Sequence, residues 1–193
     1  MTVQTITSSF STNTYVICDE GLAVVIDPSG DADKIDRCIA ENGCKLVAIL
    51  LTHGHFDHID ALKKLATRSG VPTYISRNDV AMLSDPYLNA SWLVFENLSV
   101  TVDNVNLLDG GEELCFGEMR FKVLATPGHT SGSLCYLSER ALFSGDTLFA
   151  DGYGRTDLPN SAPEQYTSSL LSIHTLLKSC TLYPGHGRII YKE

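Results

Sequence analysis

The sequence predicts a layered α/β fold in which short strands alternate with a few helices. The first observation is the length of 193 residues, of which 44% are hydrophobic and 19% charged, as is usual for one packed soluble domain. The second is a series of short apolar runs separated by turn-forming residues. The third is that segments with helical spacing lie between those runs. We therefore expect a single domain over residues 1–193, which is neither all-β nor a helical bundle.

The expected strands are runs rich in Val, Ile, Leu and Tyr, which favour extended structure. In chain order they are residues 14–18, 22–26, 46–51, 71–75, 100–108, 119–125, 133–137 and 141–143. A further short strand is expected after the last helix, in the apolar stretch that precedes Tyr183.

The expected helices carry apolar residues at intervals of three and four. They are residues 31–41, 58–68, 79–83 and 162–177. Ser161 and Glu164 have the spacing of a capping box, which predicts the start of the last helix. Residues 87–97 follow no regular period and are expected to form a surface loop.

Charge and cysteine usage limit the possible partners and the compartment. The net charge of −9 argues against a nucleic-acid partner or an anionic membrane, because carboxylates repel phosphates. No signal peptide or membrane-spanning run is present in the sequence, so we expect a cytoplasmic protein. The six cysteines include no Cys-x-x-Cys pair, and we interpret them as buried, reduced thiols.

The strongest functional signal follows the expected strand 46–51. The sequence Thr52-His53-Gly54-His55-Phe56-Asp57-His58 places four possible metal ligands within six residues. Imidazoles and carboxylates are the ligands that zinc, iron and manganese accept. The alternative is a polar turn whose histidines are solvated. Such a dense cluster after a strand favours the metal site.

Three more potential ligands occupy similar positions. His129 in Pro-Gly-His, Asp146 in Ser-Gly-Asp and His186 in Pro-Gly-His each follow an apolar run and a glycine that permits a sharp turn. Ligands held at strand ends are presented from a rigid framework. His174 lies within the last expected helix and is interpreted as a partly exposed surface histidine.

Taken together, residues 52–60, 126–133, 144–149 and 183–187 resemble the signature of the metallo-β-lactamase superfamily in order and spacing. This resemblance implies an αββα sandwich of two mixed β-sheets with helices on the outer faces. It implies one metal on His53, His55 and His129, a second on Asp57, His58 and His186, and Asp146 as the bridge. Zinc is the first expectation for the two divalent ions, with iron or manganese as alternatives.

One further acidic residue matches the family pattern. Asp27, at the end of an early strand, would support the site from outside the ligand shell, or it could be a plain turn-former before Pro28.

Residues 144–149 and 154–159 resemble the glyoxalase II branch, in compact form without a carboxy-terminal helical region, and its sister, the persulfide dioxygenases. The first expectation is hydrolysis of S-D-lactoylglutathione, a small-molecule thioester, by a hydroxide that bridges the metals, with Asp57 and Asp146 in catalytic positions. Arg155 and Tyr153 are expected to contact the substrate, although Arg155 could instead form a surface ion pair.

Two alternatives remain open. The first is a glutathione persulfide dioxygenase with one iron, and the second is a non-catalytic metal-binding protein of the same fold. β-Lactam hydrolysis and nucleic-acid processing are disfavoured by the missing export signal and by the acidic charge. The sequence makes no prediction of the oligomeric state.

Overall fold

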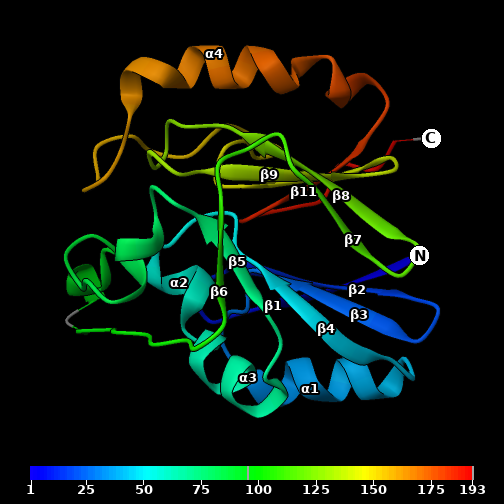
Figure 1. Cartoon of the computed structure of the whole chain (residues 1–193). Helices are drawn as coiled ribbons and strands as arrows, with labels where there is room; N and C mark the ends of the chain where they lie inside the picture. Colours follow the sequence, from blue (N-terminus) through cyan, green and yellow to red (C-terminus); the bar gives the residue numbers. More distant parts are fainter. Residues whose placement is uncertain (95, 193) are drawn as a thin grey trace.

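Two mixed β-sheets pack face to face, and helices cover their outer faces (Figure 1). The structure, a computed structural model, describes residues 1–94 and 96–192. The first sheet has the order β1-β2-β3-β4-β5-β6. Its strands are β1 (Thr2–Thr7), β2 (Asn13–Asp19), β3 (Leu22–Ile26), β4 (Lys45–Leu50), β5 (Thr73–Ser76) and β6 (Val105–Leu108). Strands β1 to β3 pair antiparallel, whereas β3 to β6 pair parallel.

The second sheet has the order β11-β10-β9-β8-β7. Its strands are β7 (Glu113–Phe116), β8 (Met119–Ala125), β9 (Leu134–Ser138), β10 (Ala141–Gly145) and β11 (Thr181–Pro184). The pairs from β7 to β10 are antiparallel, and β10 pairs parallel with β11. As a result β10 and β11 end at the same edge, where two of the expected ligands follow.

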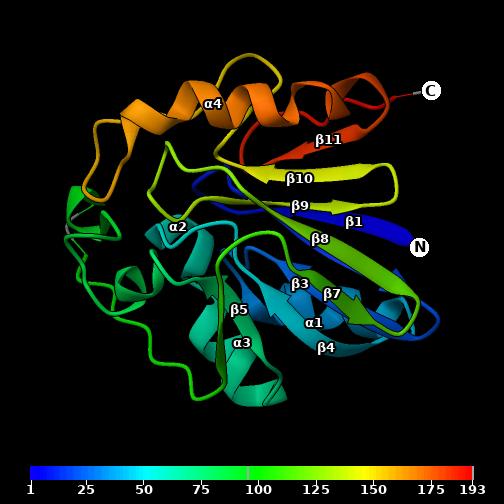
Figure 2. The ribbon, with the colours of Figure 1, turned by 45° about the horizontal axis from the view of Figure 1, so that its top comes forward.

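Helices form the two outer layers. They are α1 (Ala32–Glu41), α2 (Phe56–Ile59), α3 (Leu62–Ser69) and α4 (Pro163–His174), with short 3-10 turns η1 (Val80–Leu83), η2 (Ser91–Val94) and η3 (Leu176–Lys178). Figures 1 and 2 show α1 and α3 on the first sheet and α4 across the second. This confirms the four-layer metallo-β-lactamase fold. Among the described residues, no helix is both long and apolar enough to cross a membrane.

The core has three apolar layers, one shared between the two sheets and one under the helices on each outer face. In β3, Val24 and Ile26 face the second sheet, while Ala23 and Val25 belong to the cluster under α1 and α3. Because successive side chains of a strand alternate between faces, burial on both faces produces a continuous apolar run. A third cluster lies under α4.

The expected helix 58–68 is divided in the structure into α2 and α3. The backbone N–H of Ala61 donates to Pro28 O at 3.2 Å, and Gly30 N donates to Asp60 Oδ1 at 2.7 Å. These bonds to the turn after β3 replace the regular helical pattern. The short α2 therefore belongs to the candidate site, while α3 packs against the core.

Other element boundaries differ at the edges of the sheets. The edge strands β1 and β7 were not expected, because half or more of their residues are exposed. The expected strand 100–108 is reduced to β6, since Val100 N instead donates to Leu83 O at 2.7 Å. Of the expected loop 87–97, residues 91–94 form η2, and Phe95 lies outside the described residues.

The predicted capping box at Ser161 is wrong. The cap residue of α4 is Ala162, whose side chain makes no capping bond. Ser161 Oγ instead donates to His129 O at 2.8 Å. The hydroxyl therefore fixes the backbone of a candidate ligand.

Candidate metal centre

All seven candidate ligands lie together at one end of the sandwich, each after a strand. His53 and His55 follow β4, Asp57 and His58 lie on α2, and His129, Asp146 and His186 follow β8, β10 and β11. Their ligand atoms form three overlapping groups, each with atoms within 4.8 Å of one another: His53, His55 and His129; His53, His58 and Asp146; and Asp57, His58 and His186. His174, by contrast, ends α4 as an exposed residue.

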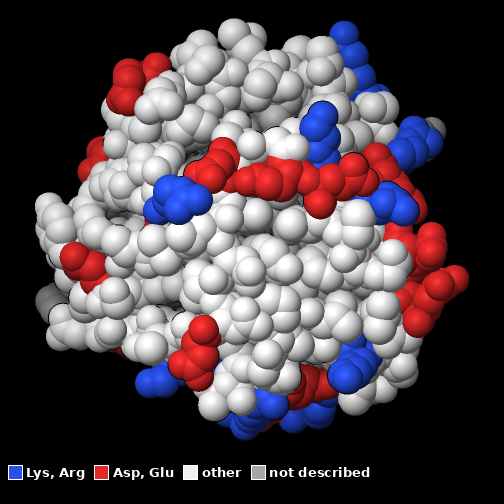
Figure 3. Space-filling model, in the orientation of Figure 1, with Lys and Arg blue, Asp and Glu red and all other residues white. Residues whose placement is uncertain are grey.

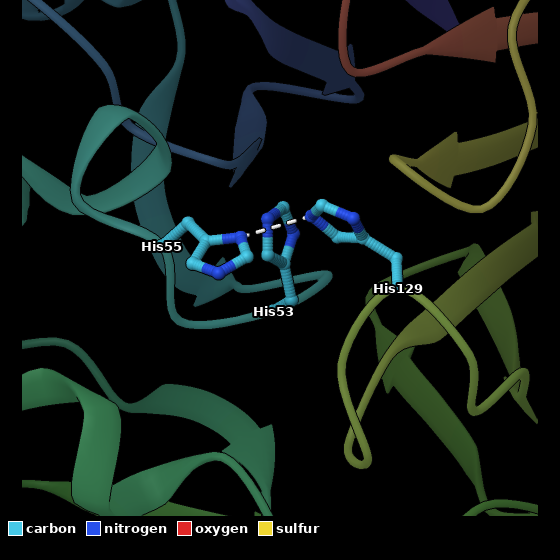
Figure 4. A group of neighbouring side chains, drawn as sticks. All are labelled: His53, His55 and His129. Atoms are coloured by element: carbon cyan, nitrogen blue, oxygen red, sulfur yellow. Dashed lines mark hydrogen bonds between the residues drawn. The ribbon is translucent and has the colours of Figure 1, made fainter. Parts of the chain in front are cut away.

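The first group consists of three buried imidazoles. Figure 4 shows the rings of His53, His55 and His129 turned toward one another from two loops. Nδ1 of His55 and Nε2 of His129 lie 2.9 Å apart. Nitrogens that converge in this way are suited to share one cation.

The set Asp57, His58 and His186 is called the second group from here on, and it adds negative charge. His186 Nε2 lies 3.2 Å from Asp57 Oδ2, and His58 Nε2 lies 3.6 Å from the same oxygen. Asp146 is placed between the groups, because its Oδ2 is 3.6 Å from both His129 Nε2 and His186 Nε2. This carboxylate is therefore in reach of both groups.

Backbone carbonyls fix the tautomers of two of these histidines. His129 Nδ1 lies 2.7 Å from Arg155 O, and His186 Nδ1 lies 3.1 Å from Ser11 O. A carbonyl oxygen can only accept, so each Nδ1 carries the proton and donates it. In a neutral ring this leaves the lone pair on Nε2, which faces the centre. Such outer hydrogen bonds are typical of metal-binding histidines.

Asp27 is not a candidate ligand, but its carboxylate contacts residues that belong to or adjoin both groups. Its Oδ1 accepts from Thr52 N at 2.7 Å, and its Oδ2 accepts from Thr52 Oγ1 at 2.6 Å. Oδ2 also lies 3.0 Å from His58 Nδ1. Since Thr52 donates its proton to Asp27, it accepts from His53 Nδ1 at 3.1 Å. One buried carboxylate thus orients an imidazole of each group.

Burial keeps the histidines of the first group neutral. Desolvation lowers the pKa of His53 well below its usual range, lowers that of His55 to about 3, and lowers that of His129. A neutral imidazole is the form that binds a metal. Near neutral pH these rings therefore offer lone pairs rather than positive charge.

In the second group, carboxylates surround His58. Burial opposes ionisation there, yet Asp57, Asp146 and Asp27 together raise the pKa of His58. Burial likewise disfavours the charged forms of Asp57 and Asp146, but His58 and the other neighbouring histidines together more than offset it, so both pKa values are lowered. Three carboxylates around buried imidazoles create a negative potential that favours a bound cation.

The unpaired polar atoms fit a metal. Nε2 of His53 and His58 and Oδ1 of Asp146, whose side chains belong to one of the ligand groups, are buried and make no hydrogen bond within the described residues. Leaving such atoms unpaired costs about 1–3 kcal/mol each. A bound divalent cation would accept these convergent nitrogen and carboxylate lone pairs together. The residues present therefore fit the metals that the sequence implies.

The centre opens into a cleft in which Arg155 is one of the lining residues. The guanidinium of Arg155 is exposed and makes two bonds to Asp157, at 2.6 and 2.8 Å. Tyr153 is 64% exposed and meets Tyr166 edge to face at 5.7 Å. Tyr153 thus lies on the surface beside the segment of Arg155.

Two residues that hold the site were not predicted. Thr12, just before β2, donates from Oγ1 to Asp57 Oδ2 at 2.8 Å. Asp79, before η1, is fully buried and accepts from Thr130 Oγ1 at 2.7 Å and from Gly132 N at 2.9 Å. Neither contact could be read from a local sequence motif, because the two residues that form it are distant in sequence.

Replacing Asp27 with asparagine is expected to weaken metal binding about 10- to 100-fold. Asparagine tolerates the left-handed backbone of this position, where φ is 51°. It would, however, lose one acceptor oxygen for Thr52 or His58. Competition with a chromogenic chelator measures the change, and Asp109→Asn on the surface is the control. Equal affinity in the natural chain and Asp27→Asn would contradict the role of Asp27.

Asp79 ties the His129 loop to the segment around Asn160, whose Nδ2 donates to Asp79 Oδ1 at 2.8 Å. Burial raises the pKa of Asp79 to about 6, against the lowering effect of its hydrogen bonds. The folded chain therefore holds this proton more tightly than the unfolded chain. Stability from this group is present below the unfolded pKa and is lost as pH rises through about 6.

Asp79→Asn removes this titration, which gives a testable pH dependence. The free energy of unfolding of the natural chain, relative to the variant, should be greater near pH 5 than near pH 7.5 by roughly 1–2 kcal/mol. Urea unfolding of metal-free protein at both pH values measures the difference. A difference that grows with pH instead would show that the hydrogen bonds to the carboxylate outweigh its burial.

The fold and site together define a two-sheet α/β protein with a candidate binuclear metal centre at the strand ends. The chain belongs to the metallo-beta-lactamase superfamily, whose family model matches residues 8–186. Among curated proteins, it is 37% identical to the probable metallo-hydrolase YqgX of Bacillus subtilis, over 91% of this chain and 84% of that protein. It is therefore a member of a metallo-hydrolase family.

A second relative carries a named activity. The chain is 34% identical to the hydroxyacylglutathione hydrolase of Francisella philomiragia, over 89% of this chain and 61% of that protein. It therefore spans about three fifths of that enzyme's length.

Solved structures show the same fold. BLEG-1, described as a B3 metallo-beta-lactamase, matches with a TM-score of 0.90 and 33% identity, over 97% of this chain and 93% of that one. TTHA1623, described in a di-iron-bound form, matches with a TM-score of 0.85 and 30% identity, over 98% of this chain and 93% of that one. ETHE1 from Myxococcus xanthus matches with a TM-score of 0.76 and 33% identity, over 97% of this chain and 76% of that one.

Proposed function

We propose that this chain is a metal-dependent thioester hydrolase that holds two divalent ions, with S-D-lactoylglutathione as the first substrate to test. The observation that carries the proposal is the convergence of seven candidate ligands at one cleft, with Asp146 in reach of both groups. The hydroxyacylglutathione hydrolase relative supports the choice of substrate.

In this proposal the residues of the chain have distinct tasks. His53, His55 and His129 would hold one ion; Asp57, His58 and His186 would hold the other, with Asp146 between them. When bound, the ions would lower the pKa of a water molecule and stabilise the negative charge that develops on the substrate carbonyl. A leaving thiolate has a pKa near ~8.5, so the chain need not supply a strong acid.

Substrate contacts are proposed for Arg155 and Tyr153. Because the guanidinium of Arg155 already binds Asp157, a substrate carboxylate would have to displace that partner. Asp157→Asn should therefore strengthen the binding of a carboxylate-bearing thioester, if Arg155 is its partner.

Zinc is the first proposal for the metal, and elemental analysis of protein purified without added metal would identify it. Assay with S-D-lactoylglutathione before and after chelation tests the activity. Chelated protein should be inactive, and the same ion should restore turnover. Absence of metal-dependent turnover with any thioester would reject the proposed function.

A persulfide dioxygenase with one iron is the second candidate, supported by the likeness to ETHE1. Uptake of oxygen with glutathione persulfide, together with one iron per chain, would favour it over the hydrolase. The complete second group of ligands favours the hydrolase, because a single iron has less need of it.

We also propose that the protein acts in the cytoplasm on a small molecule. All six cysteines are free in the structure, as expected where thiols are kept reduced. On the face shown in Figure 3, acidic side chains form a band and basic ones are dispersed. Such a surface would repel the backbone of a nucleic acid.

A further inference from the structure

The cleft at the candidate metal centre has an apolar wall. Alongside the ligand side chains it is lined by Phe56, Ala90, Leu93, Phe149 and Leu158. Phe56 is stacked edge to face with Phe10 at 5.1 Å. The candidate ligands and an apolar surface therefore line the same cleft.

This wall is held firmly against the site. Phe56, between two candidate ligands, donates its backbone N–H to Asn89 O at 2.9 Å. The buried side chain of Asn89 donates to Met82 O at 3.0 Å and to Leu98 O at 2.8 Å. Leu93 N then donates to Ala90 O at 3.1 Å. The segment that carries Leu93 is thus anchored to the loop of the ligands.

Part of the wall is left open to solvent. Leu93 is 43% exposed and its neighbour Trp92 is 46% exposed. Trp92 stacks on Tyr87 with ring centroids 6.2 Å apart. Covering the exposed part of such side chains with an apolar ligand is favourable by about 25 cal/mol per Å².

The cleft offers little to a charged arm. Among the described residues that line it, Arg155 is the only Lys or Arg, and it is already bound to Asp157 at 2.6 and 2.8 Å. The thiol arms of biological thioesters are polar peptides or pantetheine chains. The acyl arm is the part of a thioester that can be wholly apolar.

We infer that the acyl arm of the substrate is an apolar chain of several carbons, which lies against Leu93 and Leu158. This inference rests on the proposed thioester hydrolysis and, within it, favours apolar acyl thioesters over S-D-lactoylglutathione as substrates. A short hydroxylated acyl group such as lactoyl would leave most of the wall uncovered.

Binding can be tested without turnover. Trp92 is the single tryptophan of the chain, so its fluorescence reports on ligands at Leu93. S-alkyl thioethers of N-acetylcysteamine, from ethyl to octyl, are stable probes of the metal-loaded protein. The Kd should fall about threefold for each added methylene group. A Kd that does not change with chain length would overturn the inference.

Leu93→Asn, which keeps the shape but not the apolar surface, should weaken octyl binding about tenfold and leave ethyl binding nearly unchanged. Leu171→Asn is the matched control, because Leu171 is 68% exposed on α4 and does not line the cleft. Equal effects of both variants would argue against the inferred contact.

Turnover of acyl-N-acetylcysteamine thioesters, from acetyl to octanoyl, separates this inference from the proposed function. A rise of kcat/KM with chain length, lost in Leu93→Asn, supports both. Hydrolysis without dependence on chain length rejects the apolar arm but keeps the thioesterase. Chain-length-dependent binding without any turnover rejects the thioesterase but keeps the apolar site.

Discussion

Asp146→Asn is expected to lower thioester turnover by on the order of 10³ and to release at least one metal ion per chain. In the structure Asp146 Oδ2 is equally distant, at 3.6 Å, from His129 Nε2 and His186 Nε2. Its Oδ1 is 3.3 Å from His58 Nε2. An amide would remove the negative charge and turn an NH2 group toward one of these nitrogens, so that neither ion would be held as before.

Elemental analysis after dialysis, together with steady-state kinetics, measures both effects of Asp146→Asn. Asp151→Asn is a suitable control, because Asp151 is exposed and pairs with Arg188 at 2.9 Å. Two ions per chain and unchanged kcat in Asp146→Asn would show that this carboxylate does not join the two groups. If Asp146→Asn lost metal but unfolded in urea like the natural chain, Asp146 would be needed for the site and not for the stability of the fold.

The features predicted well from the sequence are those that local chemistry fixes. Four of the candidate ligands lie within six residues after one strand, so their proximity follows from the chain itself. For His129, Asp146 and His186, the preceding glycine and apolar run predicted a turn at a strand end. The buried strands β2, β3 and β4 were likewise predictable, because burial on both faces leaves continuous apolar sequence.

The features missed depend on partners distant in sequence. The break between α2 and α3 arises because Pro28 O accepts the N–H of Ala61, which no local pattern reveals. Thr12 and Asp79 act through Asp57 and Thr130, respectively, both more than 40 positions away. Ser161 shows the converse error, since its hydroxyl bonds His129 O instead of capping its own helix.

Gly185→Ala is expected to abolish tight metal binding by steric means alone. A Cβ at this position would overlap Asp146 Oδ1 and lie 2.8 Å from His58 Cε1. The backbone cannot retreat, because Gly185 N donates to Gly145 O at 2.8 Å and Gly185 O accepts from Asn13 N at 2.7 Å. The methyl group would therefore displace the carboxylate, and we expect metal affinity to fall about 100-fold or more, with an overpacking cost of roughly 1–3 kcal/mol.

Gly187→Ala separates this effect from a general disturbance of the loop. A Cβ at Gly187 meets nothing within 4 Å, but the backbone φ is +78°, which costs an alanine about 1–2 kcal/mol. Gly187→Ala should therefore lose stability while it keeps its metal, whereas Gly185→Ala should lose its metal. If both variants bound metal equally in calorimetric titration, the absence of a side chain at Gly185 would not be needed to keep Asp146 in place for the ions.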